Sequence, residues 1–414
     1  MKVLALCHDH PSFTPGGTEH QSHALVRHLC DQPDVDATFL AATTALSRPD
    51  VPPGTLESLG PDLLLRTGHY DAFTMARHDG PQWRAALARV IADLKPDIVH
   101  LHGLDRIGAD VVTFLRRHHP RLKLVLTLHD YQIICPRDGL LLMAQDDTVC
   151  SGATPIKCQG CFPEISAARH ALRAAHLRTI LGQIDAFVVP SIFVRDRFID
   201  WGLPESRIHL IRNAVPQPQS GAAPAPRAGR PNRFAYLGNL GAHKGISALL
   251  RAAQLIKDAG DDIRITIHGD LLHPSPAVKA ALEGQIAEAW PVAQHLGRYT
   301  PDEVPALLRN VDWVVLPAVW PENAPLGVLE AFAAERPVIC TPLGGLPELV
   351  QHGVNGLHVP RGDAFALAET LRRAARDPDL WARLRDGTQR RDGYAAHLDA
   401  HLALFNTLLS KVPA

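Results

Sequence analysis

The sequence predicts an α/β protein with two doubly wound parallel-sheet domains, and two observations carry this prediction. Short apolar runs of strand length alternate with longer amphipathic stretches along most of the 414 residues, which is the pattern of parallel strands covered by helices on both faces. A stretch rich in Pro, Ala and Gly at residues 216–231 interrupts the alternation, which then restarts. We therefore predict a first domain at residues 1–215, a linker at 216–231 and a second domain at 232–390.

The first domain opens with a buried-type strand at residues 3–7, followed by a loop with Gly16 and Gly17 and a helix with apolar residues at helical spacing. Further strands are expected at residues 37–41, 98–101, 122–128, 186–189 and 208–211, with helices at 83–94 and 166–184. Residues 47–80, which are rich in Pro and Gly, are interpreted as an insertion.

The second domain repeats this alternation, with strands expected at residues 234–237, 263–268, 292–296, 311–316 and 337–340 and helices beginning near 245, 278 and 326. The last segment, 391–414, contains a helical pattern and is expected to pack back on the first domain. Open parallel sheets bind ligands beyond the carboxyl ends of their strands, so we expect a cleft where the two domains face each other.

The charge balance excludes some classes of protein. The chain has 42 Lys and Arg against 43 Asp and Glu, which gives no net field for binding nucleic acid. No apolar run reaches the ~18 residues that span a bilayer, and the run at residues 3–6 is too short for a signal peptide. We expect a soluble cytoplasmic protein. Basic clusters at residues 116–123 and 169–178 leave two interpretations open, peripheral contact with the inner face of a membrane or a solvated basic face.

The first motif with chemical meaning follows the strand expected at 234–237. It runs from Gly238 and Asn239 to Lys244 and Gly245, and a helix follows it. Glycines permit close backbone approach, a helix start offers unpaired N–H groups, and Lys244 adds a positive charge, a combination that suits a diphosphate. A plain strand-to-helix turn with a solvated lysine is the alternative.

A second motif, at residues 320–331, follows the strand expected at 311–316. Pro325 fits only the first turn of a helix, so a helix should begin near it, with Glu322 in the loop and Glu330 on the helix. Carboxylates suit the paired hydroxyls of a ribose or hexose, and amides at the helix start offer a seat for phosphate or sugar. Alternatively, Glu322 only favours the helix dipole and Glu330 is solvated.

His129 directly follows the strand expected at 122–128, which places an imidazole at the carboxyl edge of the first sheet, where substrate would lie. Gly16 and Gly17 follow the first strand and are expected at the same edge. A single histidine does not by itself define a site.

Four of the seven cysteines fall within one short stretch: Cys135, Cys150, Cys158 and Cys161. The terminal C-x-x-C with two further thiols nearby suggests a tetrahedral zinc site, although the first two spacings match no standard zinc finger. Such a site would be structural, because four thiolates leave no open position on the metal. Free buried thiols and a redox pair are the alternatives.

Taken together, these motifs resemble those of the retaining glycosyltransferases of family 4, which have the GT-B fold of two Rossmann-like domains facing each other across a cleft. The resemblance spans nearly the whole chain. It rests on Gly16-Gly17, His129-Asp130, Pro190-Ser191 with Phe193, Asn213, the loop 238–245, Glu322 and Glu330, Pro337-Val338-Ile339, Gly344-Gly345, Pro347-Glu348 and Gly353.

The resemblance implies that Lys244 neutralises the donor diphosphate, that Glu330 holds the ribose, and that Glu322 lies along the transferred sugar with His129 near the reacting centre. Asn239 stands where the family often has arginine, so phosphate binding would depend more on Lys244. The implied catalytic residues are His129, Lys244 and Glu322, and the implied donor-binding residues are Gly16, Gly17, Gly238, Asn239, Lys244, Asn323, Leu326, Gly327 and Glu330.

The expected function is retaining transfer of a sugar from a nucleotide-diphosphate donor to a glycan or lipid-linked acceptor, in surface polysaccharide or glycolipid biosynthesis. Lys244 and backbone N–H groups would stabilise the leaving diphosphate, so no catalytic metal is expected. Lys244→Ala is then expected to lower turnover with little unfolding. The alternatives are a sugar-nucleotide epimerase of the same fold and a non-catalytic protein that binds a sugar nucleotide or a metal.

Overall fold

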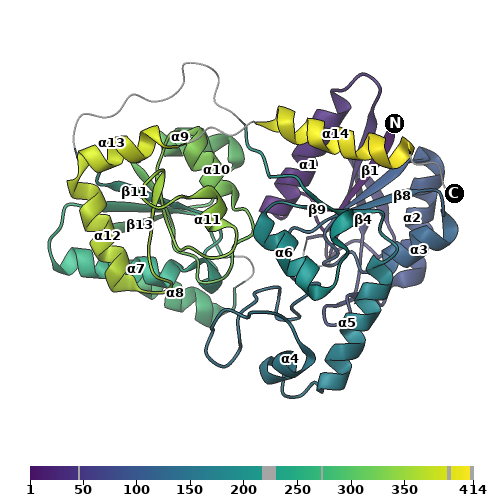
Figure 1. The fold of residues 1–414 in the computed structure, drawn as a ribbon, viewed down its shortest axis with the longest axis horizontal. Coiled ribbons are helices and arrows are strands. Elements are labelled where there is room, and N and C mark those ends of the chain that lie inside the picture. The colour runs from purple at the N-terminus through teal and green to yellow at the C-terminus, as the bar shows by residue number, and fades with distance from the viewer. Residues whose placement is uncertain (45–46, 217–229, 272–273, 389–392, 411–414) are drawn as a thin grey trace. The chain divides into compact units, whose positions relative to one another are not determined.

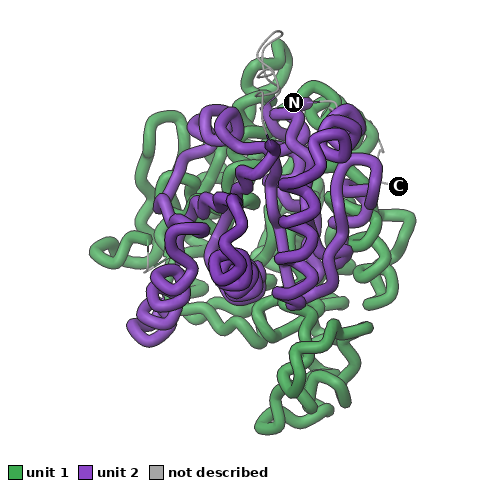
Figure 2. The backbone as a smooth tube through the Cα atoms, turned by 90° about the vertical axis from the view of Figure 1, so that its left-hand side faces the viewer, with its two compact units in different colours: residues 1–213, 394–414 green, residues 214–393 purple. Residues whose placement is uncertain are grey.

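The computed structural model describes residues 1–44, 47–216, 230–271, 274–388 and 393–410. The chain divides into two compact units, coloured separately in Figure 2: unit 1 comprises Met1–Asn213 with Tyr394–Ala414, and unit 2 comprises Ala214–Gly393. Each unit contains a parallel sheet with helices, so the predicted α/β class is confirmed. Most of the predicted linker, residues 217–229, lies outside the described residues.

Unit 1 contains ten strands and seven helices of α type among its described residues (Figure 1). Its strands are β1 (Lys2–Cys7), β2 (Asp36–Thr43), β3 (Leu56–Leu59), β4 (Asp62–Arg66), β5 (Tyr70–Asp71), β6 (Ala76–Arg77), β7 (Ile98–His102), β8 (Lys123–Thr127), β9 (Ala186–Val189) and β10 (Ile208–Leu210). Its helices are α1 (Gly17–Cys30), α2 (Gly80–Leu94), α3 (Asp110–His118), α4 (Pro155–Cys161), α5 (Ala167–Leu181), α6 (Ile192–Trp201) and α14 (Tyr394–Ser410).

The main sheet of unit 1 has the order β10-β9-β8-β7-β1-β2-β4-β3, and its neighbouring strands run parallel except for β3, which is antiparallel to β4. The strand order reverses at β1, which has β2 on one side and β7 on the other. β1 is buried from Val3 to Cys7, as expected for a strand covered on both faces. Ligands of such sheets bind beyond the carboxyl ends of the strands beside the reversal, so this is where a site in unit 1 is expected.

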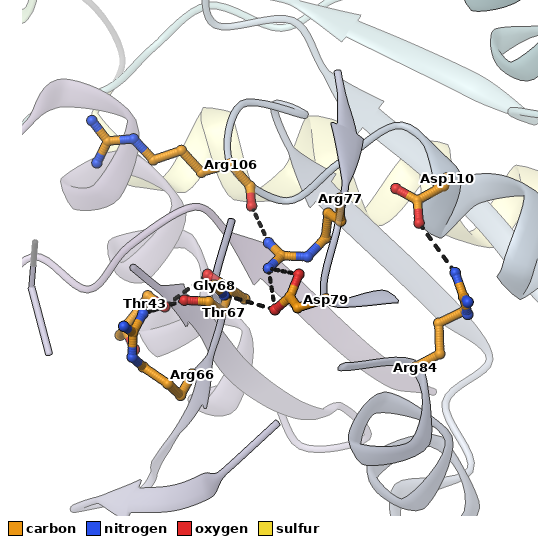
Figure 3. A network of polar contacts seen from close by, with 9 residues as sticks. All are labelled: Thr43, Arg66, Thr67, Gly68, Arg77, Asp79, Arg84, Arg106 and Asp110. Atoms are coloured by element: carbon orange, nitrogen blue, oxygen red, sulfur yellow. Dashed lines mark hydrogen bonds and ion pairs between the residues drawn. The ribbon is translucent and has the colours of Figure 1, made fainter. Parts of the chain in front are cut away.

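Residues 47–80, interpreted above as an insertion, form strands that complete one edge of this sheet and a small hairpin. Figure 3 shows the polar contacts that hold the segment: Arg77 donates to the carbonyl of Arg106 at 2.5 Å and pairs with Asp79. The Asp79 carboxylate also accepts the amide of Gly68 at 2.7 Å. The buried Arg77 guanidinium therefore has both a carboxylate and a carbonyl partner, which its burial requires.

Unit 2 contains a six-stranded parallel sheet with the order β13-β12-β11-β14-β15-β16. In sequence order this is 3-2-1-4-5-6, the doubly wound arrangement, and its switch point lies between β11 and β14. The strands are β11 (Arg233–Leu237), β12 (Arg264–His268), β13 (Ala293–Gly297), β14 (Trp313–Leu316), β15 (Val338–Cys340) and β16 (Gly356–His358). The helices are α7 (Ile246–Asp258), α8 (Pro276–Ala289), α9 (Val304–Leu308), α10 (Leu326–Ala333), α11 (Leu346–Leu349), α12 (Ala364–Arg376) and α13 (Pro378–Asp386).

Helix α14 follows unit 2 in the sequence but contributes to the core of unit 1. Its buried residues recur at helical spacing and form one face; they are Leu398, His401, Leu404, Phe405 and Leu408. The apolar members of this face share a cluster with residues of β1 and α1, and Figure 1 shows α14 beside α1. The last helix is therefore part of the unit 1 core.

No helix among the described residues is both long and apolar enough to cross a membrane. Three of the arginines that suggested a basic face are engaged within unit 1. Arg173 is buried and donates to the carbonyl of Ile133 at 2.8 Å, and Arg116 pairs with Asp185 at 2.7 Å. Arg178 donates to a backbone carbonyl of α6 at 2.8 Å. Neither interpretation of a basic face, lipid-binding or solvated, accounts for these three side chains.

Candidate active site

Lys244 is positioned by the turn between β11 and α7. Gly245 has a φ of +77°, and a Cβ at this residue would lie 1.8 Å from the carbonyl oxygen of Pro317. Only glycine fits this conformation and this close approach. The side chain of Asn239 accepts the amide of Gly241 at 2.7 Å and so shapes the turn. Lys244 consequently lies at the carboxyl end of β11, beside the switch point.

This turn offers fewer free amides than the sequence suggested. Gly238 is predicted to bind the donor through its backbone, but its N–H donates to the backbone carbonyl of His268 at 3.0 Å. Amides already used within the protein are those of Gly238, Leu240, Gly241, Lys244 and Gly245. In the described part of the chain, the amides that remain without a partner in this turn are those of Asn239, Ala242 and His243. Of the backbone N–H groups that were expected to bind a diphosphate in this turn, these three therefore remain available.

Lys244 and Glu322 form an ion pair. Nζ of Lys244 lies 2.7 Å from Oε1 of Glu322, and the indole N–H of Trp320 donates to the same oxygen at 2.8 Å. The ammonium also lies 4.8 Å from the centre of the Trp320 ring, close enough for a cation–π contact. The Glu322 side chain is 9% exposed. The alternatives of a freely solvated lysine and of a glutamate acting only on a helix dipole are wrong, but the charge of Lys244 is also balanced by Glu322.

Two glycines that carried part of the resemblance fix the backbone of Glu322. The amide of Gly345 donates to the Glu322 carbonyl at 2.6 Å. Gly344 has a φ of +64°, and a Cβ there would lie 2.1 Å from the same carbonyl oxygen. Sequence reasoning noted both glycines without a role. Their close approach to the loop after β14 is a tertiary contact, which no local pattern reveals.

Helix α10 begins at Leu326, after the N-cap Pro325, as the proline predicts. The amides of Leu326 and Gly327, in the first turn, have no acceptor within the helix, and the described structure gives them no other partner. Glu330 follows one turn later and is half-buried, while Asn323 is buried in the preceding loop. Burial raises the pKa of Glu330 to about 7. Hydroxyl groups that donate to this carboxylate would favour its charged form.

Sequence reasoning missed an ion pair at the switch point of unit 1. His8 follows β1, Glu19 lies in the first turn of α1, and Nε2 of His8 is 2.9 Å from Oε1 of Glu19. Burial alone would lower the pKa of His8, but the Glu19 carboxylate and Cys7 together outweigh burial and raise the pKa well above its usual value. A Cβ on Gly16 would lie 2.4 Å from Oε2 of Glu19. Gly16 thus makes room for this carboxylate, and Gly17 begins α1.

His129 lies beyond the carboxyl end of β8, and its Nε2 is 3.1 Å from Nδ1 of His102, the last residue of β7. Burial and then the charge of His8 lower the pKa of His129 to about 3. Burial also lowers the pKa of His102, and the charge of the neighbouring His100 lowers it further. His129 is therefore neutral at pH 7, able to exchange hydrogen bonds with a sugar hydroxyl but not to act as a fixed cation.

One group of metal-ligating side chains within the described residues is compact: atoms of His10, His23 and Asp62 lie within 4.8 Å of one another. Nδ1 of His10 accepts the amide of Ser12 at 3.1 Å, so its Nε2 carries the proton and donates to Asp62. Arg27 pairs with the other Asp62 oxygen at 2.7 Å. The carboxylate is thus satisfied by a cation and imidazole donors, and the group is an ion-pair network.

The four clustered cysteines line one pocket of unit 1. All four are free thiols of intermediate exposure. Burial and the three neighbouring cysteines raise the pKa of Cys158 to about 11. No three of the four sulfurs, all within the described residues, lie within 4.8 Å of one another. The expected zinc site is therefore not pre-assembled, although its four ligands share one pocket.

The comparisons with known proteins agree with this architecture. Residues 15–217 match the family model described as Glycosyltransferase Family 4, and residues 222–391 match the one described as Glycosyl transferases group 1. The amylovoran biosynthesis glycosyltransferase AmsK of Erwinia amylovora is 27% identical over 185 residues, which are 43% of this chain and 44% of that protein. The chain thus spans about half the length of the curated relatives it matches.

Solved structures resemble the whole chain. HepE of Anabaena in complex with UDP has a TM-score of 0.68 at 17% identity, covering 98% of this chain and 100% of that one. Sucrose-phosphate synthase of Thermosynechococcus elongatus has a TM-score of 0.74 at 19% identity, and the match covers 100% of both chains. Likeness at this identity shows the fold. The two family models show that the chain belongs to glycosyltransferase family 4, and the solved structures show that it has the GT-B fold.

Proposed function

We propose that this chain is a retaining glycosyltransferase that moves a sugar from a nucleoside-diphosphate donor to a glycan or lipid-linked acceptor in surface polysaccharide or glycolipid biosynthesis. The observation that carries the proposal is the Lys244–Glu322 pair at the switch point of a doubly wound sheet, with the free amides of Leu326 and Gly327 at the start of α10. The amylovoran relative and the UDP bound by the Anabaena protein support the pathway and the donor class.

Unit 2 binds the donor and stabilises the leaving group in this proposal. Negative charge grows on the diphosphate as the sugar–phosphate bond lengthens, and Lys244 with the amides of Leu326 and Gly327 favours that state over the ground state. The diphosphate competes with Glu322 for Lys244, and Glu322 then accepts a hydrogen bond from a sugar hydroxyl. Because the ammonium and the amides supply the positive charge, the proposal calls for no catalytic metal.

Two other residues complete the assignment. Glu330 accepts hydrogen bonds from the ribose hydroxyls, and the neutral His129 exchanges a hydrogen bond with the sugar near the reacting centre. No protein nucleophile is assigned for the retaining step. A lipid-linked acceptor would bring this cytoplasmic enzyme to the inner face of a membrane, a contact that does not depend on the arginines engaged within unit 1.

A panel of nucleotide sugars, UDP sugars first, tests the proposal through thermal shift, because a ligand that binds the folded chain raises its melting temperature. Donors that bind are then incubated with glycan and lipid-linked acceptors. We expect released nucleoside diphosphate and a new glycosidic bond whose anomeric configuration, read by NMR, matches that of the donor. Lys279→Ala, at an exposed lysine paired with Glu283, is the matched control for Lys244→Ala.

The other outcomes separate the alternatives. An altered nucleotide sugar without nucleotide release identifies a sugar-nucleotide epimerase, and binding without either product identifies a non-catalytic binding protein. A product with the opposite anomeric configuration contradicts the retaining assignment while leaving glycosyl transfer intact.

A further inference from the structure

The segment that carries the clustered cysteines buries little of its own surface. The structure describes every residue from Met143 to Arg169, and none of them is buried. The segment includes α4, which has seven residues and none buried, and Ile156 of this helix is 79% exposed. A helix this short is not stable by itself in water. Packing of apolar side chains therefore does not account for the order of this segment.

The hydrogen bonds of the segment are too weak to replace a core. Lys157 donates to the hydroxyl of Ser151 at 2.7 Å, and Gln145 donates to the carbonyl of Gly160, but all four residues of these two bonds lie at the surface. An intramolecular hydrogen bond contributes only about 0.5–1.5 kcal/mol net, because water competes for the same groups. Long segments without a core of their own usually need a cross-link or a metal.

The cysteines are placed where such a cross-link would act. Cys158 and Cys161 are three residues apart on α4, which puts them on one face of the helix. Cys135 and Cys150 line the same pocket from two other parts of the chain. The amide of Ala144 donates to the sulfur of Cys161 at 3.4 Å, and hydrogen bonds of this kind stabilise a thiolate ligand.

The charges around the pocket also suit thiolates. Arg137 and Lys157 line it together with the four cysteines. Four thiolates around a divalent cation leave a net charge of −2, which Lys157 and Arg137 offset in part, since Arg137 also pairs with Asp147 at 3.2 Å. Among the residues that the structure describes, no His side chain or carboxylate lines the pocket. The donor set is therefore all sulfur, the set that selects zinc or an iron–sulfur centre.

We propose that Cys135, Cys150, Cys158 and Cys161 bind one Zn²⁺ ion as thiolates and that this ion holds the segment following His129 in place. Each thiol gives up its proton to solvent on binding. Tetrahedral coordination needs Zn–S distances of about 2.3 Å, so the sulfurs must converge by rotation about their Cα–Cβ bonds. The site is structural, because four protein ligands leave no position for substrate.

The test measures metal content in protein purified under reducing conditions without a metal-affinity tag. We expect one zinc per chain by mass spectrometry of the elements, at least a tenfold loss of that zinc in the double variant Cys158→Ser/Cys161→Ser, and retention in Cys30→Ser. Cys30 is an exposed cysteine outside the segment and serves as the matched control. Zinc retained by the double variant would overturn the assignment.

A second measurement on the unaltered chain keeps the proposal testable if the double variant does not fold. Thiol alkylation followed by peptide mass spectrometry should label Cys135, Cys150, Cys158 and Cys161 only after a chelator is added, whereas Cys30 is labelled in both conditions. Equal labelling with and without chelator, peptides joined by a disulfide, or iron with sulfide in place of zinc would each overturn the proposal.

Discussion

At the level of single residues, the Lys244–Glu322 pair changes what a substitution is expected to do. Glu322 is almost fully buried and takes its charge partner from Lys244. Removing one partner of a buried pair leaves the other charge uncompensated and costs about 3–5 kcal/mol, whereas exposed pairs are worth under about 1 kcal/mol. Because Lys244 is 26% exposed, Lys244→Ala should cost about 1–3 kcal/mol of stability, contrary to the expectation of little unfolding.

A double variant separates the role of Lys244 in stability from its role in catalysis. Glu322→Gln keeps an oxygen for the Trp320 indole but removes the buried charge, so Lys244→Ala/Glu322→Gln should recover most of the lost stability. Transfer should stay at least tenfold reduced in both Lys244 variants, since the leaving diphosphate lacks its ammonium. Urea denaturation and initial rates at saturating donor measure the two effects. Recovery of the rate along with the stability would show that Lys244 only supports the fold.

Glu330 predicts a pH dependence with a definite sign. Its pKa is raised by burial from 4.5 to about 7, so the folded chain holds more protons than the unfolded chain between these values, and stability falls as the pH rises through this window. Glu330→Gln removes the cost of burying the charged carboxylate. The variant should therefore be more stable than the parent at pH 8, by at most about 3 kcal/mol, and equally stable below about pH 4.5.

The same substitution should weaken donor binding, because ribose hydroxyls donate to a carboxylate better than to an amide. For the parent chain, donor affinity should rise as the pH increases through about 7, where the carboxylate becomes charged. Thermal melts at pH 4.5 and 8 and calorimetric titration of the donor across this range measure both effects. A variant that loses stability at pH 8, or a donor affinity that is flat with pH, would contradict the assigned role.

At the level of elements, Gly245 and Gly327 both lie in the candidate site, but the lack of a side chain has a different role at each. A Cβ on Gly245 would meet the Pro317 carbonyl oxygen at 1.8 Å, whereas a Cβ on Gly327 would be 3.7 Å from the nearest atom, a side-chain carbon of Leu316. Packing thus demands the first glycine but not the second. Gly327 lies in the first turn of α10, where a bare backbone would instead admit a phosphate or a sugar.

We therefore predict opposite effects for the two alanine variants. Gly327→Ala should keep or raise the melting temperature, because alanine favours a helix by up to about 1 kcal/mol, and should weaken donor binding at least fivefold. Gly245→Ala should destabilise unit 2 outright. Melting curves and donor titrations of both variants test this. Unchanged donor binding in a folded Gly327→Ala chain would remove the start of α10 from the site.

The elements show which parts of this site a sequence can predict. Local sequence pattern predicts the strands, the start of α10 after Pro325, and the positions of Lys244, Glu322 and His129 beyond strand ends. The structure places them there. Three other features are contacts between distant segments: the His8–Glu19 pair, the Lys244–Glu322 pair, and the hydrogen bond from the Gly238 N–H to the carbonyl of His268. Local periodicity carries no information on such contacts, so they could not be predicted.

At the scale of the whole molecule, both units show the same topology around their first strand. β1 lies between β2 and β7, and β11 lies between β12 and β14, so each unit has a switch point beside the strand that opens it. In each unit an ion pair lies at the carboxyl end of that strand, His8 with Glu19 and Lys244 with Glu322. The repeated arrangement explains why the residues of the candidate site gather at the carboxyl ends of β1, β7, β8, β11 and β14.

Unit 1 also depends on the end of the chain, which predicts how the molecule responds to changes in α14. Phe405 is fully buried in the cluster shared with β1 and α1, whereas Thr407, two residues later, is exposed. Phe405→Ala should cost about 3–5 kcal/mol, a large part of the stability of a domain. Thr407→Ala should stay within about 0.5 kcal/mol of the parent chain.

The buried face of α14 belongs to unit 1 alone, so the stability lost in Phe405→Ala should be confined to that unit. Hydrogen exchange measured by mass spectrometry should show faster exchange in β1, β2 and α1 of Phe405→Ala and unchanged exchange in β11, β14 and α7. Donor binding, which we assign to unit 2, should survive at temperatures where unit 1 has begun to open, while transfer should be lost. Equal acceleration in both units would mean that the chain unfolds as one cooperative body and that α14 stabilises more than the core it joins.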